Sequence, residues 1–349
     1  MVYYFIVNPD KGIDMIRCRF FIMIMLISMS SASCAFIAGK DDSGAPGQDD
    51  KHIRLHYVET LRNQASLRGE GFRDVVHSVG TPTTLQRPNS VFADAFRVYV
   101  TDQTQPPRVF IFDRGDRTAS ILAVPFPPAE GKLLNPLSIA VDIGNVIYVA
   151  DAQQGKVFGY DRNGVLLLVF GKAGDLAYPT GIAIDKRRNR ICIADSHAHL
   201  VKAFTMMGVR IFEIGDAGKS DQRLKSPTGI ALDQEGRIHV LDSQSRRVSV
   251  YDPDGKFLRK FPLSRGGVGD SIRPQGIAVD SAGHIYVSDS VNNNILIFQA
   301  DGNFLTTWGK TGIVSGDFWT PQGLFIDERD TIYIADQANS RIQVYQFIK

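Results

Sequence analysis

The chain has 349 residues, of which 44% are apolar, 10% aromatic and 22% charged, with 32 glycines and 16 prolines. This is the composition of a globular protein, and it excludes a disordered, collagen-like or coiled-coil chain. Thirty-nine basic residues against 37 acidic residues give a net charge of +2, which is too balanced to favour nucleic acid as a partner.

Residues 1–33 are typical of a secretory signal peptide. Residues 20–29 are apolar apart from Ser28; Arg17 and Arg19 precede them, and small residues follow. A membrane-spanning helix needs about twenty apolar residues, so this stretch is too short to span. A basic region, a short apolar region and small residues before a cleavage point predict export. Translation could start at Met1 or at Met15.

The segment that ends at Cys34 resembles the lipobox of bacterial lipoproteins, in which that cysteine becomes the lipidated first residue. Ser31 departs from the pattern, which prefers Leu, Val or Ile at that position. The resemblance implies lipidation at Cys34 and membrane contact through the lipid anchor alone. Secretion with cleavage near Ala35 or Ala38, and an uncleaved anchor, are the alternatives.

Two segments separate this leader from the repeats. Residues 34–52 are polar and contain Gly and Pro, which predicts a flexible tether, and residues 53–71 form a lead-in segment. Beyond the tether, Cys192 is the one remaining cysteine. Its neighbours Ile191 and Ile193 predict a packed core thiol rather than a catalytic one.

One sequence unit occurs six times between residues 88 and 336. It begins with proline, continues as a small, apolar strand that ends in aspartate six positions later, and adds a second apolar strand that also ends in aspartate. The third copy reads Pro-Thr-Gly-Ile-Ala-Ile-Asp over residues 179–185 and Ile-Cys-Ile-Ala-Asp over residues 191–195. The opening prolines lie 43 to 48 residues apart, at Pro88, Pro136, Pro179, Pro227, Pro274 and Pro321.

Each unit contains four short β runs, which in the fifth unit cover about residues 276–279, 285–288, 295–298 and 304–308. The turns between these runs have Asp at their start and Gly at positions that require a positive φ. Four antiparallel strands every forty-odd residues form the blade of a β-propeller. The sequence therefore predicts an all-β, six-bladed propeller over residues 72–347, with small residues in the first strands because six strands crowd around the axis.

The units resemble the NHL repeat, whose signature is Pro-x-Gly-Ile-Ala-Val-Asp, then Ile-Tyr-Val-Ala-Asp, Asn, Arg-Ile/Val and Phe/Tyr. The closest match contains Asp336, Asn339, Arg341, Ile342 and Tyr345. The resemblance is greatest to secreted bacterial six-bladed NHL proteins. It implies a propeller in the cell envelope, periplasmic or associated with the outer membrane as a lipoprotein, or otherwise secreted.

The sixth unit ends after its third strand, near residue 347. Residues 72–79 followed by Gly80 align with residues 304–308 followed by Gly309. We therefore predict that an N-terminal strand, residues 72–79, closes the ring by pairing with the last blade, which removes exposed sheet edges.

The repeated aspartates lie at strand-to-turn junctions, where a carboxylate accepts hydrogen bonds from turn N–H groups, so we interpret them as structural. His197 and His199 share one loop and could reach one metal, but two ligands make a weak site without a third, such as His239. The basic run at 186–190 occupies one hairpin loop, and we interpret it as a solvated turn. We expect no cofactor and a monomer.

The metal ligands of enzymes that share the repeat can be compared with the residues of this sequence at the same positions. Peptidyl-hydroxyglycine lyases bind zinc through histidines directly after the blade-opening proline, and lactonase-type propellers hold calcium with acidic and amide residues near the channel. The positions after the prolines are here neutral: Asn89, Leu137, Thr180, Thr228, Gln275 and Gln322. A hydrolase or lyase with its catalytic residues in other loops stays the alternative to a non-enzymatic binding module.

The binding hypothesis places recognition of a protein, peptide or glycan at one mouth of the central channel. The polar residues after the prolines, Asn89, Thr180, Thr228, Gln275 and Gln322, offer neutral donors and acceptors there. Tyr178 and Trp319 lie in the loops that lead into this mouth, and aromatic anchors are typical of binding hot spots. The alternative for Trp319 is packing against the edge of the next blade.

Overall fold

The computed structural model describes residues 54–67, 84–122, 131–171, 174–215, 222–264 and 271–348. The chain divides into two units, Met1–Asp49 and Asp50–Lys349, and all described residues belong to the second. The predicted signal peptide, Cys34, the whole tether and the predicted strand 72–79 lie outside the described residues.

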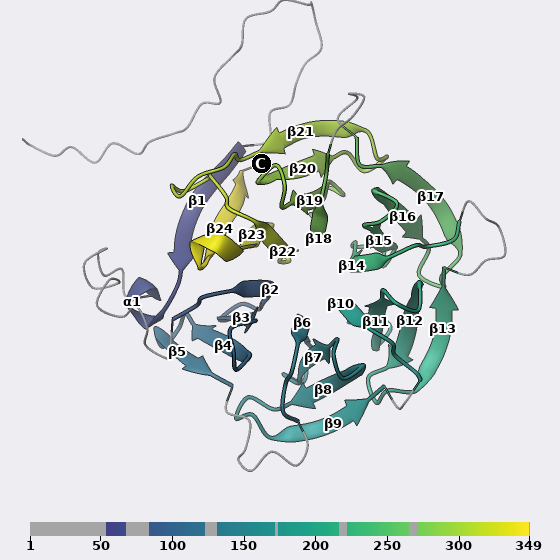
Figure 1. The fold of residues 1–349 in the computed structure, drawn as a ribbon, viewed down its shortest axis with the longest axis horizontal. Helices are drawn as coiled ribbons and strands as arrows, with labels where there is room; N and C mark the ends of the chain where they lie inside the picture. Colours follow the sequence, from purple (N-terminus) through teal and green to yellow (C-terminus); the bar gives the residue numbers. More distant parts are fainter. Residues whose placement is uncertain are drawn as a thin grey trace, which may run out of the picture. The chain divides into compact units, whose positions relative to one another are not determined.

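The described residues form six antiparallel, four-stranded sheets arranged as the blades of a propeller (Figure 1). Blade 1 contains β2 (Pro88–Ala93), β3 (Arg97–Asp102), β4 (Arg108–Asp113) and β5 (Thr118–Ile121), and blade 2 contains β6 (Pro136–Val141), β7 (Ile147–Asp151), β8 (Lys156–Tyr160) and β9 (Leu166–Phe170). Blade 3 contains β10 (Pro179–Asp185), β11 (Arg190–Asp195), β12 (Leu200–Thr205) and β13 (Arg210–Ile214), and blade 4 contains β14 (Pro227–Leu232), β15 (Ile238–Asp242), β16 (Arg247–Tyr251) and β17 (Phe257–Pro262).

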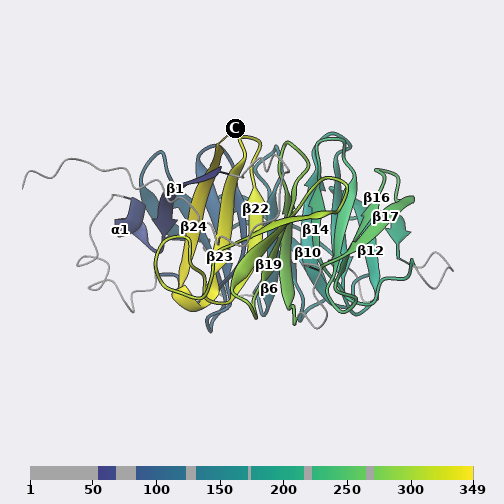
Figure 2. The same cartoon turned by 90° about the horizontal axis from the view of Figure 1, so that it is seen from above.

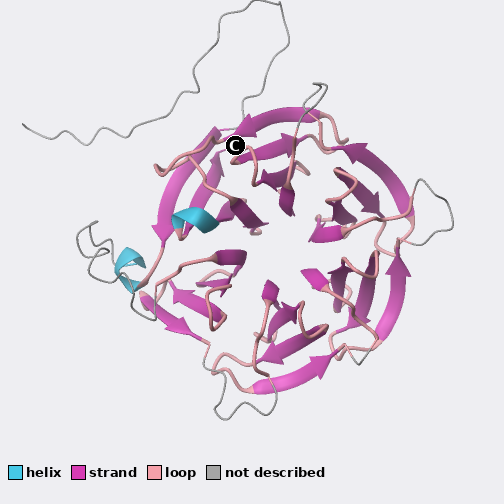
Figure 3. Cartoon of the chain, in the orientation of Figure 1, coloured by secondary structure: helices cyan, strands magenta, loops and turns pink. Residues whose placement is uncertain are grey.

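The last two blades complete the ring. Blade 5 contains β18 (Pro274–Val279), β19 (Ile285–Asp289), β20 (Asn294–Phe298) and β21 (Phe304–Trp308), and blade 6 contains β22 (Pro321–Ile326), β23 (Thr331–Asp336), β24 (Arg341–Ile348) and β1 (Arg54–Leu61). The helical segments of the described residues are the short α1 (Gln64–Leu67) and the 3-10 turn η1 (Gln337–Asn339) (Figure 3). The predicted six-bladed fold is confirmed.

An N-terminal strand closes the ring as predicted, but the predicted residues were wrong. The outer strand of blade 6 is β1, which pairs antiparallel with β24 from Arg54 opposite Ile348 to Leu61 opposite Ile342. Leu61 of β1 is fully buried in the core. Its burial stabilises β1 in its position as the outer strand of blade 6. Part of the segment interpreted as a lead-in therefore belongs to the propeller.

The inner strands follow one another around the axis. Each first strand contacts the first strand of both neighbouring blades, and β2 contacts β22, which joins the last blade to the first. Figure 2 shows these strands running between the two faces of the ring. The second strands of blades 2 to 6 are buried along their whole length, and in β3 only Arg97 is partly exposed, because each second strand lies inside a blade that is packed between two others.

Glycine is required in the inner strands because neighbouring backbones approach closely there. A Cβ on Gly276 would lie 2.8 Å from the Gln322 carbonyl oxygen, and one on Gly323 would lie 2.7 Å from that of Asn89. Neither gap admits a methyl group. The crowding of inner strands predicted from the repeat is therefore present at the interface of blades 5 and 6 and at that of blades 6 and 1.

Candidate functional site

The inner strands enclose a central cavity of about 640 Å³, which every blade helps to line. Its two ends differ in chemistry. We call the end at which the inner strands begin the proline mouth, and its ring of residues is Asn89, Leu137, Thr180, Thr228, Gln275 and Gln322. We call the opposite end, formed by the turns that follow the inner strands, the turn mouth, and its charged lining residues are Asp185, Lys186, Arg187, Asp233, Asp280, Asp327, Glu328 and Asp330.

The structure brings all five predicted polar residues together at the proline mouth, half-buried in the cavity wall. Several of them join blades. Asn89 Nδ2 donates to the Leu137 carbonyl oxygen in blade 2 (2.7 Å), and Thr180 Oγ1 donates to the Pro227 carbonyl oxygen in blade 4 (3.1 Å). These side chains therefore stabilise the ring as well as line its opening.

Hydrogen-bonding capacity remains at this mouth. Gln275 Nε2 donates to Ser290 Oγ (3.0 Å) and Gln322 Nε2 donates to the Thr320 carbonyl oxygen (3.3 Å), while Thr228 and Ser243 bond through their hydroxyls. Within the described part of the chain, the amide oxygens of Asn89, Gln275 and Gln322 accept no hydrogen bond. The proline mouth thus presents acceptors to a ligand.

The predicted aromatic residues flank this mouth but do not line the cavity. Tyr178 stacks on His197, with ring centroids 4.3 Å apart and an interplanar angle of 17°, and its hydroxyl accepts a hydrogen bond from Asn135 Nδ2 (3.2 Å). Trp319 is 50% exposed, and its backbone N–H donates to Asp336 Oδ1 (2.7 Å). Half of Trp319 thus remains accessible.

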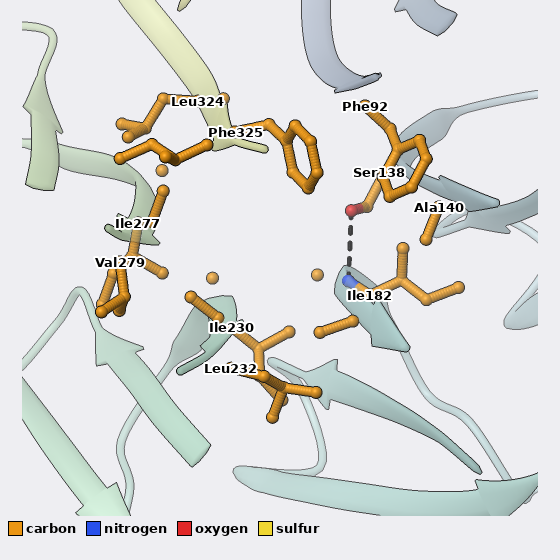
Figure 4. A pocket seen from close by; sticks show the side chains of 18 of the residues that line it. Phe92, Ser138, Ala140, Ile182, Ile230, Leu232, Ile277, Val279, Leu324 and Phe325 are labelled. Carbon is orange, nitrogen blue, oxygen red and sulfur yellow. Dashed lines mark hydrogen bonds between the residues drawn. The ribbon is translucent and has the colours of Figure 1, made fainter. Parts of the chain in front are cut away.

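The middle of the cavity is apolar (Figure 4). Branched aliphatic side chains from the inner strands line it. Ser138 also lines it, but its Oγ already accepts a hydrogen bond from the Ile182 N–H of blade 3 (3.1 Å). Phe92 and Phe325, in neighbouring blades, lie with ring centroids 4.6 Å apart. A ligand that enters this region meets hydrocarbon.

The turn mouth contains an ion pair that sequence reasoning missed. Lys186 Nζ lies 2.7 Å from Glu328 Oε1, although Lys186 belongs to blade 3 and Glu328 to blade 6. Blades 3 and 6 lie opposite each other in the ring (Figure 1). The ion pair therefore spans the opening. Lys186 was interpreted as part of a solvated turn, and no local pattern relates it to a residue 142 positions away.

The carboxylates at the turn mouth are bonded within the protein. Burial alone would raise the pKa of Asp233, but hydrogen bonds from His239 Nε2 (2.8 Å) and Arg237 Nε (2.7 Å) outweigh it and lower the pKa to about 2. Asp330 accepts hydrogen bonds from the Ser281 N–H (2.8 Å) and hydroxyl (2.6 Å). Asp233 thus stabilises its own turn, as predicted for the repeated aspartates, whereas Asp330, which is not one of them, joins the turns of blades 5 and 6.

The second aspartate of each unit is buried beneath the proline mouth. Asp195 accepts the backbone N–H groups of Ala177 (2.9 Å) and Tyr178 (2.8 Å) and pairs with Lys202 Nζ (2.9 Å). Because these N–H groups belong to the two residues before the opening proline, the carboxylate positions the entry of each inner strand. Its charge is covered, and the ring of residues that lines the mouth is neutral.

The histidines considered as metal ligands and the cysteine considered as a core thiol do not share a site among the described residues. His199 Nδ1 contacts the Lys225 carbonyl oxygen, and His239 pairs with Asp233 instead of approaching the 197–199 loop as a third ligand. Among the residues that the structure describes, no three His, Cys, Asp or Glu side chains gather as a metal site. Cys192 is fully buried, and this burial raises the pKa of its thiol to about 12.

Comparisons with known proteins agree with the architecture. A family model of the NHL repeat matches residues 176–204, and one described as a 6-bladed beta-propeller matches residues 275–349. The chain is a six-bladed β-propeller with NHL repeats. The propeller is 28% identical over 145 residues to Protein brain tumor of Drosophila melanogaster, a match that covers 40% of this chain and 14% of that protein.

Solved structures share the fold of the propeller. Virginiamycin B lyase from Staphylococcus aureus is 13% identical, with a TM-score of 0.55 over 85% of this chain and 100% of that one. An auxiliary nutrient binding protein from Bacteroides thetaiotaomicron is also 13% identical, with a TM-score of 0.57 over 76% of this chain and 70% of that one. One is an enzyme and the other a binding protein, so the shared fold does not choose between these functions.

Proposed function

We propose that the protein is a non-enzymatic binding module that recognises a protein, peptide or glycan at the proline mouth. The observation that carries the proposal is the ring of neutral amides and hydroxyls around the opening of an apolar cavity. A mostly apolar pocket with a few placed polar groups is the usual form of a ligand site. The free amide oxygens of Asn89, Gln275 and Gln322 supply the polar contacts.

Aromatic residues beside the mouth extend this surface. Trp319 is half exposed, and Tyr178 is fixed by its stack on His197. A rigid aromatic ring loses little conformational entropy on binding, and Trp and Tyr are enriched among residues that dominate binding energy. Tyr178 directly precedes the opening proline Pro179, and Trp319 lies two residues before Pro321. A ligand bound at the mouth would therefore reach both side chains.

The test compares the two mouths. Tagged full-length protein captures binding partners from cell-envelope extract, and the double variant Tyr178→Ala/Trp319→Ala should lose most of that capture with little change in melting temperature. The matched control is Arg187→Ala/Arg188→Ala at the turn mouth, which should capture as the parent does. Normal capture by the first variant and lost capture by the second would place recognition on the other face.

The proposal includes export of the protein, anchored to a membrane by a lipid on Cys34. No helix within the described residues is long and apolar enough to cross a membrane, and the support for export is the sequence of the leader. Mass spectrometry of the purified protein should find a diacylated or triacylated cysteine at the N-terminus. An unmodified terminus at Phe36 or Gly39 would contradict the lipid anchor and leave secretion in place.

A further inference from the structure

The two sides of the central cavity are lined by different side chains, aliphatic residues on one side and two phenylalanines on the other. Five of the six blades have a branched aliphatic residue just before the first aspartate, and three of these, Ile184, Leu232 and Val279 on consecutive blades, line the cavity and are only partly buried. Hydrocarbon that is left open inside a closed ring is unfavourable in water. These side chains would gain burial from an apolar ligand.

The opposite wall departs from the repeat. The residue two positions before the first aspartate is Ala140, Ala183, Ala231 or Ala278 in four blades, whereas blades 1 and 6 carry Phe92 and Phe325 there. The two rings pack between their blades, and Phe325 remains half-buried in the cavity wall. Figure 4 shows both phenylalanines on one side of the cavity, with Ile230 and Leu232 across from them.

Within the described residues, an obstruction of the cavity is found at the turn mouth. The Lys186–Glu328 pair spans the turn mouth, and its two charges neutralise each other. Arg187 Nη1 donates to the Gln234 carbonyl oxygen of the next blade (2.5 Å), which fixes a second long side chain at the same opening. The proline mouth, where free amide oxygens are available, is therefore the entrance.

We propose that this channel binds an uncharged aliphatic chain that carries a hydrogen-bond donor, such as a hydroxyl, at one end. The chain lies between the Phe92–Phe325 wall and the Ile184, Leu232 and Val279 wall, and its donor meets the acceptors of the proline mouth. The inference rests on the proposed function, because it names the ligand chemistry of the same mouth. A volume of about 640 Å³ lies within the range of roughly 300–1,000 Å³ that is usual for small-molecule sites.

The chemistry of the wall excludes charged chains as the preferred ligand. An ammonium or carboxylate group drawn into hydrocarbon loses its hydration without a partner. By contrast, each methylene that leaves water should tighten binding about fourfold, until the chain reaches the ion pair. Inner strands of six residues, at about 3.3 Å per residue, give the channel a length of about 20 Å.

The test is displacement of the fluorescent probe N-phenyl-1-naphthylamine from full-length protein by 1-alkanols of increasing length. We expect saturable probe binding, displacement that strengthens about fourfold per methylene, and a plateau once the channel is filled. Alkylamines and alkanoates of equal length should displace the probe more weakly. A flat series, or equal displacement by charged chains, would overturn the inference.

Two matched pairs of variants locate the site. Leu232→Gln in the channel should weaken alkanol binding about fivefold or more, whereas Leu258→Gln, at a 46% exposed position on the outer strand of the same blade, should not. If Leu232→Gln fails to fold, the nearly isosteric Val279→Thr replaces it, with the exposed Val169→Thr as its control. Equal affinity in channel and outer-strand variants would contradict the assignment.

A separate variant tests whether the ion pair at the turn mouth limits the length of the bound chain. Lys186→Ala removes one half of the pair, so the plateau of the alkanol series should move to longer chains. An unchanged plateau would mean that Lys186 does not limit the channel and would overturn that part of the inference. Failure of the alkanol experiments while Tyr178→Ala/Trp319→Ala still abolishes capture would refute the aliphatic ligand and leave the proposed function standing.

Discussion

The two mouths of the channel use the same residue type in opposite ways. At the proline mouth, aspartates such as Asp195 and Asp336 are fully buried and paired with Lys202 and Arg341, and the exposed ring is neutral. At the turn mouth the carboxylates reach the channel wall, and an ion pair crosses the opening. One repeated motif therefore builds a neutral ring at one end of the channel and a charged ring at the other.

Opening the ring should have the largest effect, because both mouths depend on closure. Deleting residues 1–62 removes β1 and with it Leu61, which leaves the edge of β24 unpaired. We expect loss of cooperative unfolding and aggregation, measured by thermal denaturation followed by circular dichroism. Deletion of residues 1–50 is the control and should melt like the parent.

This deletion also decides which segment closes the ring. It retains residues 72–79, the strand that the sequence favoured, and compared with the deletion of residues 1–50 it additionally removes the strand observed next to β24. If the shortened protein melts cooperatively at the parent temperature, residues 72–79 can occupy the edge and β1 is dispensable.

Aspartates at the two mouths should respond differently to the same substitution. Asp336 accepts hydrogen bonds from Arg341 Nε (2.7 Å) and Gln343 Nε2 (3.0 Å) without contact with solvent. Asp336→Asn therefore leaves a buried guanidinium without its counter-charge and should lower the free energy of unfolding by about 3–5 kcal/mol. Urea denaturation measures the loss.

Its matched control is Asp327→Asn at the turn mouth. The amide oxygen of asparagine can still accept the backbone N–H groups of Arg329 (2.9 Å) and Thr331 (2.9 Å). The losses are the bond from the Tyr333 hydroxyl (3.3 Å) and the long, exposed ion pair with the Arg329 guanidinium (3.8 Å). We expect a loss of about 1 kcal/mol. Equal losses at the two positions would remove the distinction between the mouths.

Most of the fold could be predicted because its signals are local. Each opening proline and the aspartate six residues later lie in one short stretch, and all six inner strands begin at these prolines: Pro88, Pro136, Pro179, Pro227, Pro274 and Pro321. The closing strand could not be placed correctly because β1 carries no copy of the repeat. Its partner β24 lies at the other end of the chain, and only three-dimensional packing relates them.

The candidate site was predictable in part for the same reason. Residues after the opening prolines occupy equivalent positions, so their convergence at one mouth follows from the ring. Their bonds between blades, such as that from Asn89 to Leu137, depend on rotamers that the repeat does not encode. The Lys186–Glu328 pair joins opposite blades, and no spacing in the sequence marks it.

Two histidines near the turn mouth should titrate in opposite directions. Burial lowers the pKa of His239 despite its bond to Asp233, whereas the hydrogen bond to Asp280 raises the pKa of the more exposed His284. His239 resists protonation in the folded state, so stability falls as pH drops below its unfolded pKa of about 6.5. The contribution of His284 is present below its unfolded pKa and is lost as pH rises through its folded pKa.

Imidazole NMR signals followed against pH measure both values directly. The variants His239→Gln and His284→Gln should each cost about 1 kcal/mol, the worth of one hydrogen bond, and each should remove its own part of the pH dependence. Both histidines titrating on the same side of 6.5 would contradict the assigned environments.

The ion pair at the turn mouth should contribute least to stability, although it matters most to the shape of the channel. The side chains of Lys186 and Glu328 are 46% and 83% exposed, and such pairs are worth about 0.2–1 kcal/mol. A double-mutant cycle with Lys186→Gln and Glu328→Gln should give a coupling energy in this range at low salt that nearly vanishes at about 1 M salt, where the screening length is about 3 Å. The hydrogen bond from Lys186 lowers the pKa of Glu328, so the coupling is present above the unfolded pKa of Glu328 and is lost as pH falls through its folded pKa. A coupling that ignores both salt and acid would mean that the two side chains contact each other through packing, and the contrast between a neutral and a charged mouth would then lose its electrostatic basis.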